Sequence, residues 1–207
     1  MSDDAALRQL MEAIAAADDM AARDLLAASP LLATAALTAG ATRAAAVENF
    51  LPDIAHHIYA GDTALHVAAA AHRPAMVRAL IERGADVGAR NRRGATPLHY
   101  AADGSPGAVR WNPADQAATI ALLIASGADP NATDKNDVTA LHRAVRTRCA
   151  GAVAALLGGG ADPRRTNGNG STPAMLATRQ TGKSGSGTPE AKAQQAEILR
   201  LFEHHGV

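Results

Sequence analysis

Aromatic residues are scarce in this sequence: they make up 2% of a chain in which 47% of the residues are hydrophobic. The interior must therefore be filled mainly by alanine and leucine, which suits thin helices packed in close layers. Only one cysteine, Cys149, is present, which excludes an internal disulfide and a zinc site built on paired cysteines. A chain without such links is typical of a reducing compartment, so we expect a cytoplasmic protein.

Long apolar runs and an excess of charge of one sign are also missing. No stretch approaches the roughly 18 uninterrupted apolar residues of a membrane-spanning helix, so we expect no membrane span. Twenty basic residues balance twenty acidic ones, which argues against a chain-wide attraction to nucleic acid or anionic lipid. Any electrostatic recognition therefore has to be local.

A short motif recurs along the chain. The segment 96–102 (TPLHYAA) has counterparts at 63–69 (TALHVAA) and 139–145 (TALHRAV), and a weaker copy begins at 172 (TPAM). A second signature, Gly-Ala-Asp, follows at 84–86, 127–129 and 160–162. A recurring step of 33 residues, lengthened once to 43, indicates a repeat array with insertions. Each unit predicts an inner helix capped by threonine and an outer helix ended by glycine.

These residues resemble the ankyrin repeat, in which a threonine and Leu-His precede paired alanines and Gly-Ala-Asp follows the second helix. The resemblance covers 59–207, and a helix pair expected over 4–29 joins by its apolar pattern alone. It implies an all-α ankyrin-repeat solenoid of about five helix-turn-helix pairs with β-turn connections. It also implies that His66, His99 and His142 fix their turns by hydrogen bonding. The family's concave face of turns and inner helices binds proteins, so the resemblance implies a protein-binding function and no enzymatic activity for this chain.

We expect a single ankyrin-repeat domain over 1–207. Its parts are an N-terminal capping helix pair (1–36), an inserted helix or loop (37–58), repeats at 59–91, 92–134 and 135–167, and a C-terminal repeat (168–207). Loop insertions rich in Gly, Ser and Pro are expected at 103–113 and 181–192.

The segment 37–58 contains a short apolar pattern. Phe50, Leu51, Ile54 and Ile58 would share one face of a helix that Asn49 caps. Such a helix either closes the seam between the cap and the first full repeat or adds a binding element.

Candidate catalytic and metal-binding residues do not assemble in the sequence. The motif histidines belong to separate repeats, about 8–10 Å apart, whereas zinc ligands converge within a little over ~2 Å of one ion. The adjacent pairs His56-His57 and His204-His205 would point apart on a helix. We therefore expect no catalytic residue, no metal and no cofactor.

One segment is similar to a phosphate-binding loop. Residues 177–184 (ATRQTGKS) end in Gly182, Lys183 and Ser184, but that motif works only where the loop leaves a strand and opens a helix. Nucleotide binding is therefore the remote alternative. The main alternative to a general protein-interaction module is an inhibitor or immunity-like protein that blocks a specific enzyme.

Cys149 lies at the start of a predicted second helix. The neighbouring Arg146 and Arg148 would lower the pKa of a reactive thiol there. The other interpretation is a cysteine that only packs.

The resemblance assigns partner-binding residues to the turn tips and to the exposed ends of the inner helices: Tyr59, Asp62, Arg92, Arg93, Lys135, Asn136, Arg146, Thr147, Asn169, Arg179 and Gln180. Five of these are basic and one is acidic, which favours an acidic peptide or protein surface. A merely solvated face is the alternative. Trp111, in the first loop insertion, either packs against the second helices or is an exposed anchor. We expect a monomer with a protein partner and no nucleic acid.

Overall fold

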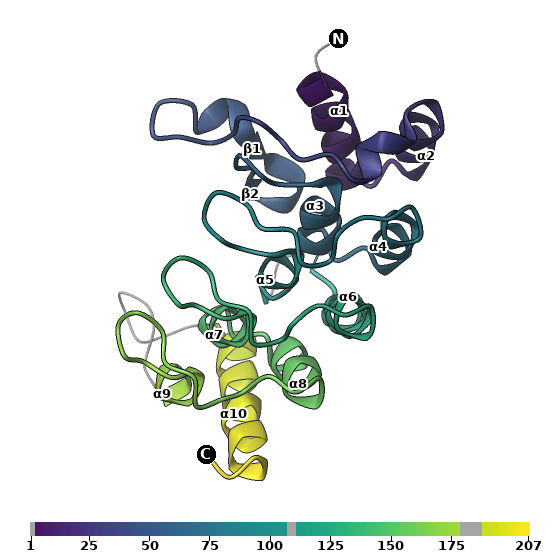
Figure 1. Ribbon diagram of the computed structural model, residues 1–207. Coiled ribbons are helices and arrows are strands. Elements are labelled where there is room, and N and C mark those ends of the chain that lie inside the picture. Colours follow the sequence, from purple (N-terminus) through teal and green to yellow (C-terminus); the bar gives the residue numbers. More distant parts are fainter. Residues whose placement is uncertain (1–2, 107–110, 179–187) are drawn as a thin grey trace.

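Ten α-helices and one small hairpin make up the part of the chain that the computed structural model describes, residues 3–106, 111–178 and 188–207. The helices follow one another as antiparallel pairs that stack in chain order (Figure 1). The pairs are α1 (Asp3–Ala16) with α2 (Asp19–Ala28), α3 (Ala64–Ala70) with α4 (Pro74–Ile81), α5 (Pro97–Ala101) with α6 (Pro113–Ala125), α7 (Ala140–Arg146) with α8 (Ala150–Gly158), and α9 (Pro173–Thr178) with α10 (Pro189–His204). The predicted all-α solenoid of five helix pairs is confirmed.

The sequence dictates where the helices begin and end. Asp18 accepts a hydrogen bond from the Ala21 amide (3.0 Å) and so caps α2, because a short polar side chain satisfies an otherwise unpaired donor. Between the paired helices of three units the chain turns through a left-handed residue, at Ala17 (φ 65°), His72 (φ 51°) and Arg148 (φ 58°). These three pairs are therefore closed by a tight corner at the same place.

The helices form two layers around one continuous apolar core. The inner helices α1, α3, α5, α7 and α9 pack on one another in that order, and the outer helices α4, α6, α8 and α10 do the same. Buried residues run without a break from Leu7 in α1 to Phe202 in α10. No single pair encloses an interior, so each depends on its neighbours.

The segment 37–58 does not form the helix we expected. It forms an antiparallel hairpin of β1 (Phe50–Leu51) and β2 (His56–His57), with 3-10 turns at η2 (Val47–Asn49) and η3 (Pro52–Ile54). Pro52 disfavours a helical residue before it, and Leu51 is extended (φ −98°, ψ 102°). His56 and His57 therefore lie on a strand, where neighbouring side chains alternate between faces.

The two predicted loop insertions also differ in extent. The first ends at Asn112, whose side chain caps α6, and residues 107–110 lie outside the described ranges. The second reaches only Thr188, which caps α10, so residues 189–192 are helical rather than loop. Each helix in the described ranges is too short or too polar to cross a bilayer.

Candidate functional site

The repeated threonine and histidine form a capping box at the start of an inner helix. The Thr63 amide donates to His66 Nδ1 (3.2 Å), and the His66 amide donates to Thr63 Oγ1 (3.4 Å). Because Nδ1 accepts, Nε2 carries the proton and donates to the Ala95 carbonyl of the next turn (3.1 Å). The histidine therefore fixes its own helix and the following turn, as predicted.

The same arrangement recurs twice. His99 pairs with Thr96 and reaches the Val138 carbonyl (2.9 Å), and His142 pairs with Thr139 and reaches the Ser171 carbonyl (3.0 Å). Burial disfavours the charged ring and lowers the pKa of all three motif histidines, that of His99 to about 4. Within the described ranges, no three His, Cys, Asp or Glu side chains gather as metal ligands.

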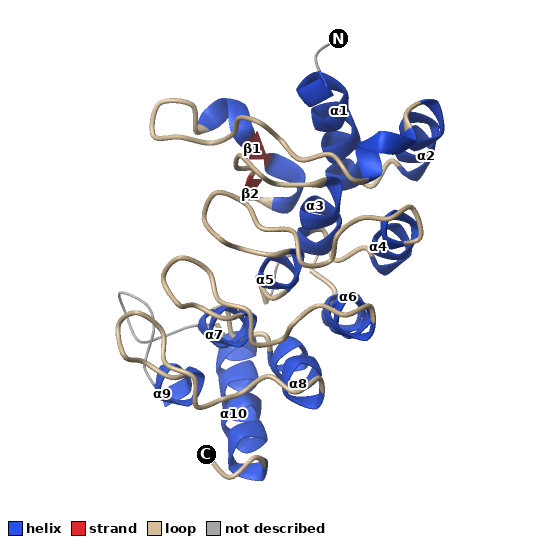
Figure 2. Ribbon diagram, viewed as in Figure 1, coloured by secondary structure: helices blue, strands red, loops and turns tan. Residues whose placement is uncertain are grey.

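The turns between successive pairs, which we call fingers, are joined by backbone hydrogen bonds. The amides of Arg92, Lys135 and Gly168 donate to the carbonyls of Ala60 (2.7 Å), Arg93 (2.9 Å) and Asn136 (2.9 Å), respectively. Each finger bends at a positive φ, at Gly61, Gly94, Asp137 and Gly170. The fingers project from the same side of the stack (Figure 2). Their tips therefore form a row whose backbone spacing is fixed.

Most of the predicted tip side chains are exposed on this row. Arg92, Arg93, Lys135, Asn136 and Asn169 are all exposed. Asp137 is exposed at the same tips and offsets part of their positive charge.

Tyr59 anchors the two arginines of the row. The guanidinium carbons of Arg92 and Arg93 lie 5.3 Å and 5.1 Å from the centre of the Tyr59 ring, within cation–π range. Arg93 also donates to the Tyr59 hydroxyl (3.1 Å), and Arg92 donates to the Ala41 carbonyl. Both guanidiniums are therefore held in place by contacts within the protein.

Asp62 is not on the surface. Its carboxylate is fully buried and accepts hydrogen bonds from the Tyr59 amide (2.7 Å), the Asn91 side chain (2.8 Å) and the Tyr100 hydroxyl (2.8 Å). Burial and the neighbouring Asp62 carboxylate raise the pKa of Tyr100. Asp62 therefore holds two repeats together and is unavailable to a partner.

The inner-helix face differs between the two halves of the molecule. Val67, Tyr100, Arg143 and Leu176 occupy one repeat position, four residues after their threonine. Val67 and Tyr100 are each only 1% exposed. The segment 37–58 lies over this part of the face: η3 packs on α1, and the His56 ring lies 4.3 Å from the Tyr100 ring. In the N-terminal half the face is therefore covered by the chain itself.

Over α7 and α9 the same face is more open than over α3 and α5, but only in part. The Arg143 side chain is 11% exposed and Leu176 is partly exposed, whereas Met175, which is 48% exposed, occupies the position of the motif histidines. The Arg143 side chain pairs with Asp103 (2.9 Å) and Asp134 (3.3 Å). Sequence reasoning missed Arg143, although an arginine in the place of Val67 on an inner helix was a visible signal.

Family models match the chain over most of its repeats. A model of ankyrin repeats in many copies matches residues 49–101 and 123–177, and a single-repeat model matches residues 93–135. The chain belongs to the ankyrin-repeat family. Ankyrin repeats are generally protein–protein interaction modules, and the family is typically non-enzymatic. No curated protein matched the chain.

Arg146 and Thr147, at the end of the ankyrin inner helix α7, have different environments. The Arg146 side chain is 57% exposed and lies 3.9 Å from Asp103. The Thr147 hydroxyl donates to the Arg143 carbonyl (3.0 Å) and is partly buried. Only Arg146 therefore offers its polar group freely to a partner.

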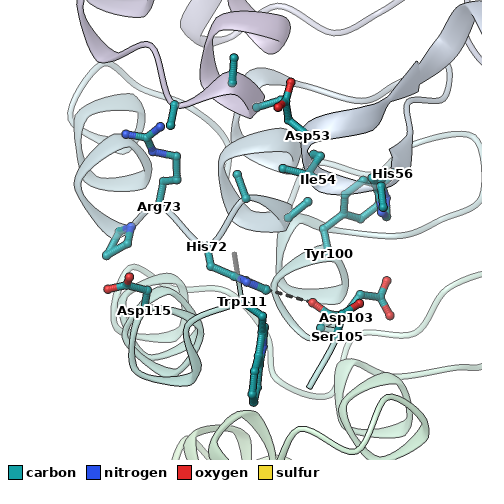
Figure 3. Close-up of a pocket in the computed structure, with 18 of the residues that line it drawn as sticks. Asp53, Ile54, His56, His72, Arg73, Tyr100, Asp103, Ser105, Trp111 and Asp115 are labelled. Carbon is teal, nitrogen blue, oxygen red and sulfur yellow. Dashed lines mark hydrogen bonds between the residues drawn. The ribbon is translucent and has the colours of Figure 1, made fainter. Parts of the chain in front are cut away.

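A groove of about 740 Å³ is lined by residues from the corners between paired helices, from the segment 37–58 and from the first loop insertion (Figure 3). Its walls include His56, His72, Tyr100, Trp111 and Asp115. Trp111 is partly buried and donates to Gln116 in α6 (2.9 Å), so it packs against a second helix while one side lines the groove. The charged groups on the walls that could recognise a ligand are engaged inside the protein: Asp103 with Arg143, Asp115 with Asn112, and Arg73 with Asp19.

Cys149 is a packing residue of the fourth ankyrin pair. It is fully buried, and burial raises the pKa of its thiol, opposite to the lowering expected from Arg146 and Arg148. A Cβ atom added to Gly104 would lie 2.6 Å from its sulfur, so the first loop insertion closes over it.

Some assigned positions cannot be placed on the ankyrin stack. Arg179 and Gln180, together with the loop residues Gly182, Lys183 and Ser184, lie outside the described residues.

Proposed function

We propose that this ankyrin-repeat protein binds an acidic surface of another protein through its finger tips and the open face of α7 and α9. The observation that carries the proposal is the row of exposed cations, Arg92, Arg93 and Lys135, on fingers joined by backbone hydrogen bonds. Arginine pairs with carboxylates through two parallel hydrogen bonds, and a fixed row loses little conformational entropy on binding.

The proposed surface keeps most of the residues assigned from the sequence. It consists of Tyr59, Arg92, Arg93, Lys135, Asn136, Arg146 and Asn169, with Arg179 and Gln180 as further members. Asp62 is withdrawn because it is buried. Thr147 and Trp111 are left out because their polar groups are bonded within the protein.

We also propose that the chain acts as one domain and as a monomer in the cytoplasm. The continuous core from Leu7 to Phe202 supports a single domain. The fully buried Cys149 supports a chain that makes no disulfide with a partner. The repeats divide at 59–91, 92–134, 135–167 and 168–207, after the cap at 1–36 and the segment 37–58.

Charge reversal tests the proposed surface. The wild-type protein is used to capture partners from its source cell, and a captured partner identified by mass spectrometry is then titrated against purified variants. The double change Arg92→Glu with Arg146→Glu should leave melting nearly unchanged and weaken binding about tenfold or more. Arg78→Glu is the control, because Arg78 is exposed on the outer helix α4, away from the fingers. Equal binding by the wild type and the double variant would remove the assignment.

A further inference from the structure

The finger formed by residues 37–58 exposes apolar side chains beside the basic row. Val47 is 89% exposed and Phe50 is 38% exposed. In a 3-10 turn, residues three apart lie on the same side, so Val47 and Phe50 share one face of η2 and its end. Large apolar side chains so open to water need an explanation when they gather at one place.

The outer side of the hairpin leads from this apolar pair to the arginines. The Phe50 and His57 rings lie 4.8 Å apart. Ile58 is buried and His56 packs inward on Tyr100, so alternation along the extended chain directs His57 and Tyr59 to the outer side. Tyr59 then contacts both Arg92 and Arg93. We call Val47, Phe50, His57, Tyr59, Arg92 and Arg93 the aromatic–arginine strip.

We propose that the strip binds an acidic protein segment that carries a large apolar residue at one end. The carboxylates of the segment pair with Arg92 and Arg93, and its apolar side chain packs on Phe50 and Val47. This inference rests on the proposed function and adds the composition of the partner segment. Charge complementarity selects the acidic part, and the exposed pair selects the apolar end.

The side chains of Arg92 and Arg93 are preorganised for binding. Tyr59 and the Ala41 carbonyl hold the guanidiniums, so little side-chain freedom is lost when they bind. An arginine fork presents several N–H donors, and the bonds described above use one on Arg92 and one on Arg93.

A single-stranded nucleic acid fits the strip less well. Stacking of bases needs an open aromatic face, but guanidiniums flank the Tyr59 ring and the Phe50 ring already contacts His57. Val47 is aliphatic and has no ring on which a base could stack.

Three synthetic peptides test the inference by fluorescence anisotropy. One is hexaglutamate flanked by glycine, and the other two replace the glycine at the N-terminal or the C-terminal end by phenylalanine. Each phenylalanine peptide carries fluorescein at the end opposite to phenylalanine, and hexaglutamate is labelled at either end to match. Phenylalanine should tighten binding about tenfold in one of the two orientations. Arg92→Gln with Arg93→Gln should weaken the binding of all three peptides about tenfold.

Variants of the apolar pair separate this inference from the proposed function. Val47→Ser with Phe50→Ser should remove only the gain due to phenylalanine and leave hexaglutamate binding unchanged. Leu31→Ser is the matched control, because Leu31 is 78% exposed on η1 (Pro30–Ala33), outside the strip. If hexaglutamate binds through the arginines but phenylalanine adds nothing, the inference is wrong while the basic surface stands. If none of the acidic peptides binds more tightly than hexalysine, or if a ten-nucleotide thymidine strand binds better, the inference is overturned together with the acidic partner.

Discussion

The two halves of the stack use the same repeat position in different ways. In the N-terminal half, Val67 and Tyr100 are sealed beneath the segment 37–58. In the C-terminal half, Arg143 and Leu176 occupy the equivalent positions and are partly exposed. Repeat geometry thus fixes where a side chain points, but the neighbouring chain decides whether a partner can reach it. The part of the inner-helix face left for recognition is therefore shifted toward α7 and α9.

The largest expected effect on stability comes from truncating the side chain at this repeat position in each half. Tyr100→Ala removes a buried ring and leaves Asp62 with one donor fewer, so it should lower the free energy of unfolding by about 3–5 kcal/mol. Arg143→Ala should cost less, about 1–2 kcal/mol, because the Asp103 side chain is 26% exposed to water and Asp134 still accepts hydrogen bonds from the Asn136 and Val138 amides. Urea unfolding curves measure both. Equal losses at the two sites would contradict the contrast between the halves.

Within the covering segment, two adjacent residues face opposite ways. Leu51 is 6% exposed and Phe50 is 38% exposed. Leu51→Ala should destabilise the segment by about 2 kcal/mol, seen as faster hydrogen exchange at the Ile58 amide, which donates to the Asn49 carbonyl (2.9 Å). Phe50→Ala is the matched control and should leave that exchange rate nearly unchanged. If both variants exchange alike, the segment does not cover the face as described.

Acid should weaken the hydrogen bonds by which the motif histidines join successive repeats in both halves. An unfolded histidine binds a proton near its ordinary pKa of about 6.5, whereas His99 in the folded protein does so only near 4. The unfolded state therefore binds more protons below pH 6.5, so stability is full above that pH and is lost as the pH falls. Between pH 7 and pH 5, His99 should account for about 2 kcal/mol of the lost stability.

Urea unfolding at several pH values checks this loss. His99→Asn should flatten the dependence between pH 7 and pH 5. His204→Asn should leave it unchanged, because His204 is exposed at the end of α10. If the stability of the His99→Asn variant depends on pH as steeply as that of the wild type, His99 is not a neutral imidazole in the folded protein.

The smallest effect is expected on the open half. Arg146 is exposed and lies 3.9 Å from Asp103, a geometry worth little in water. Arg146→Ala should therefore change the free energy of unfolding by less than about 0.5 kcal/mol, measured by thermal or urea unfolding. A larger loss would mean that the open face contributes to folding as the covered face does.

The sequence predicted what is local and periodic. The threonine–histidine boxes and the closing glycines depend on residues only a few positions apart, so the pattern located them. Local chemistry thus determined where the helices of each repeat begin and end.

Contacts between residues far apart in the sequence explain the features that the sequence did not predict. Asp62 was assigned to the surface by its place in the turn, but its side chain is drawn inward by Asn91 and Tyr100 from the next repeat. The segment 37–58 has an apolar pattern that also fits a helix, and Pro52 together with packing on α1 and Tyr100 decides for a hairpin. Neither outcome follows from periodicity within one repeat.

The histidine links give the stack a direction. Each Nε2–H reaches forward to a carbonyl of the following repeat, and none of the three motif histidines reaches backward. Shortening the array from its far end would take the acceptor from a histidine N–H donor, whereas shortening it from the near end would take the acceptor from a finger amide such as that of Arg92, which donates to the preceding repeat. Each of these junctions is therefore held by donors from both of its repeats, so the loss of a repeat at either end would leave a donor without its acceptor.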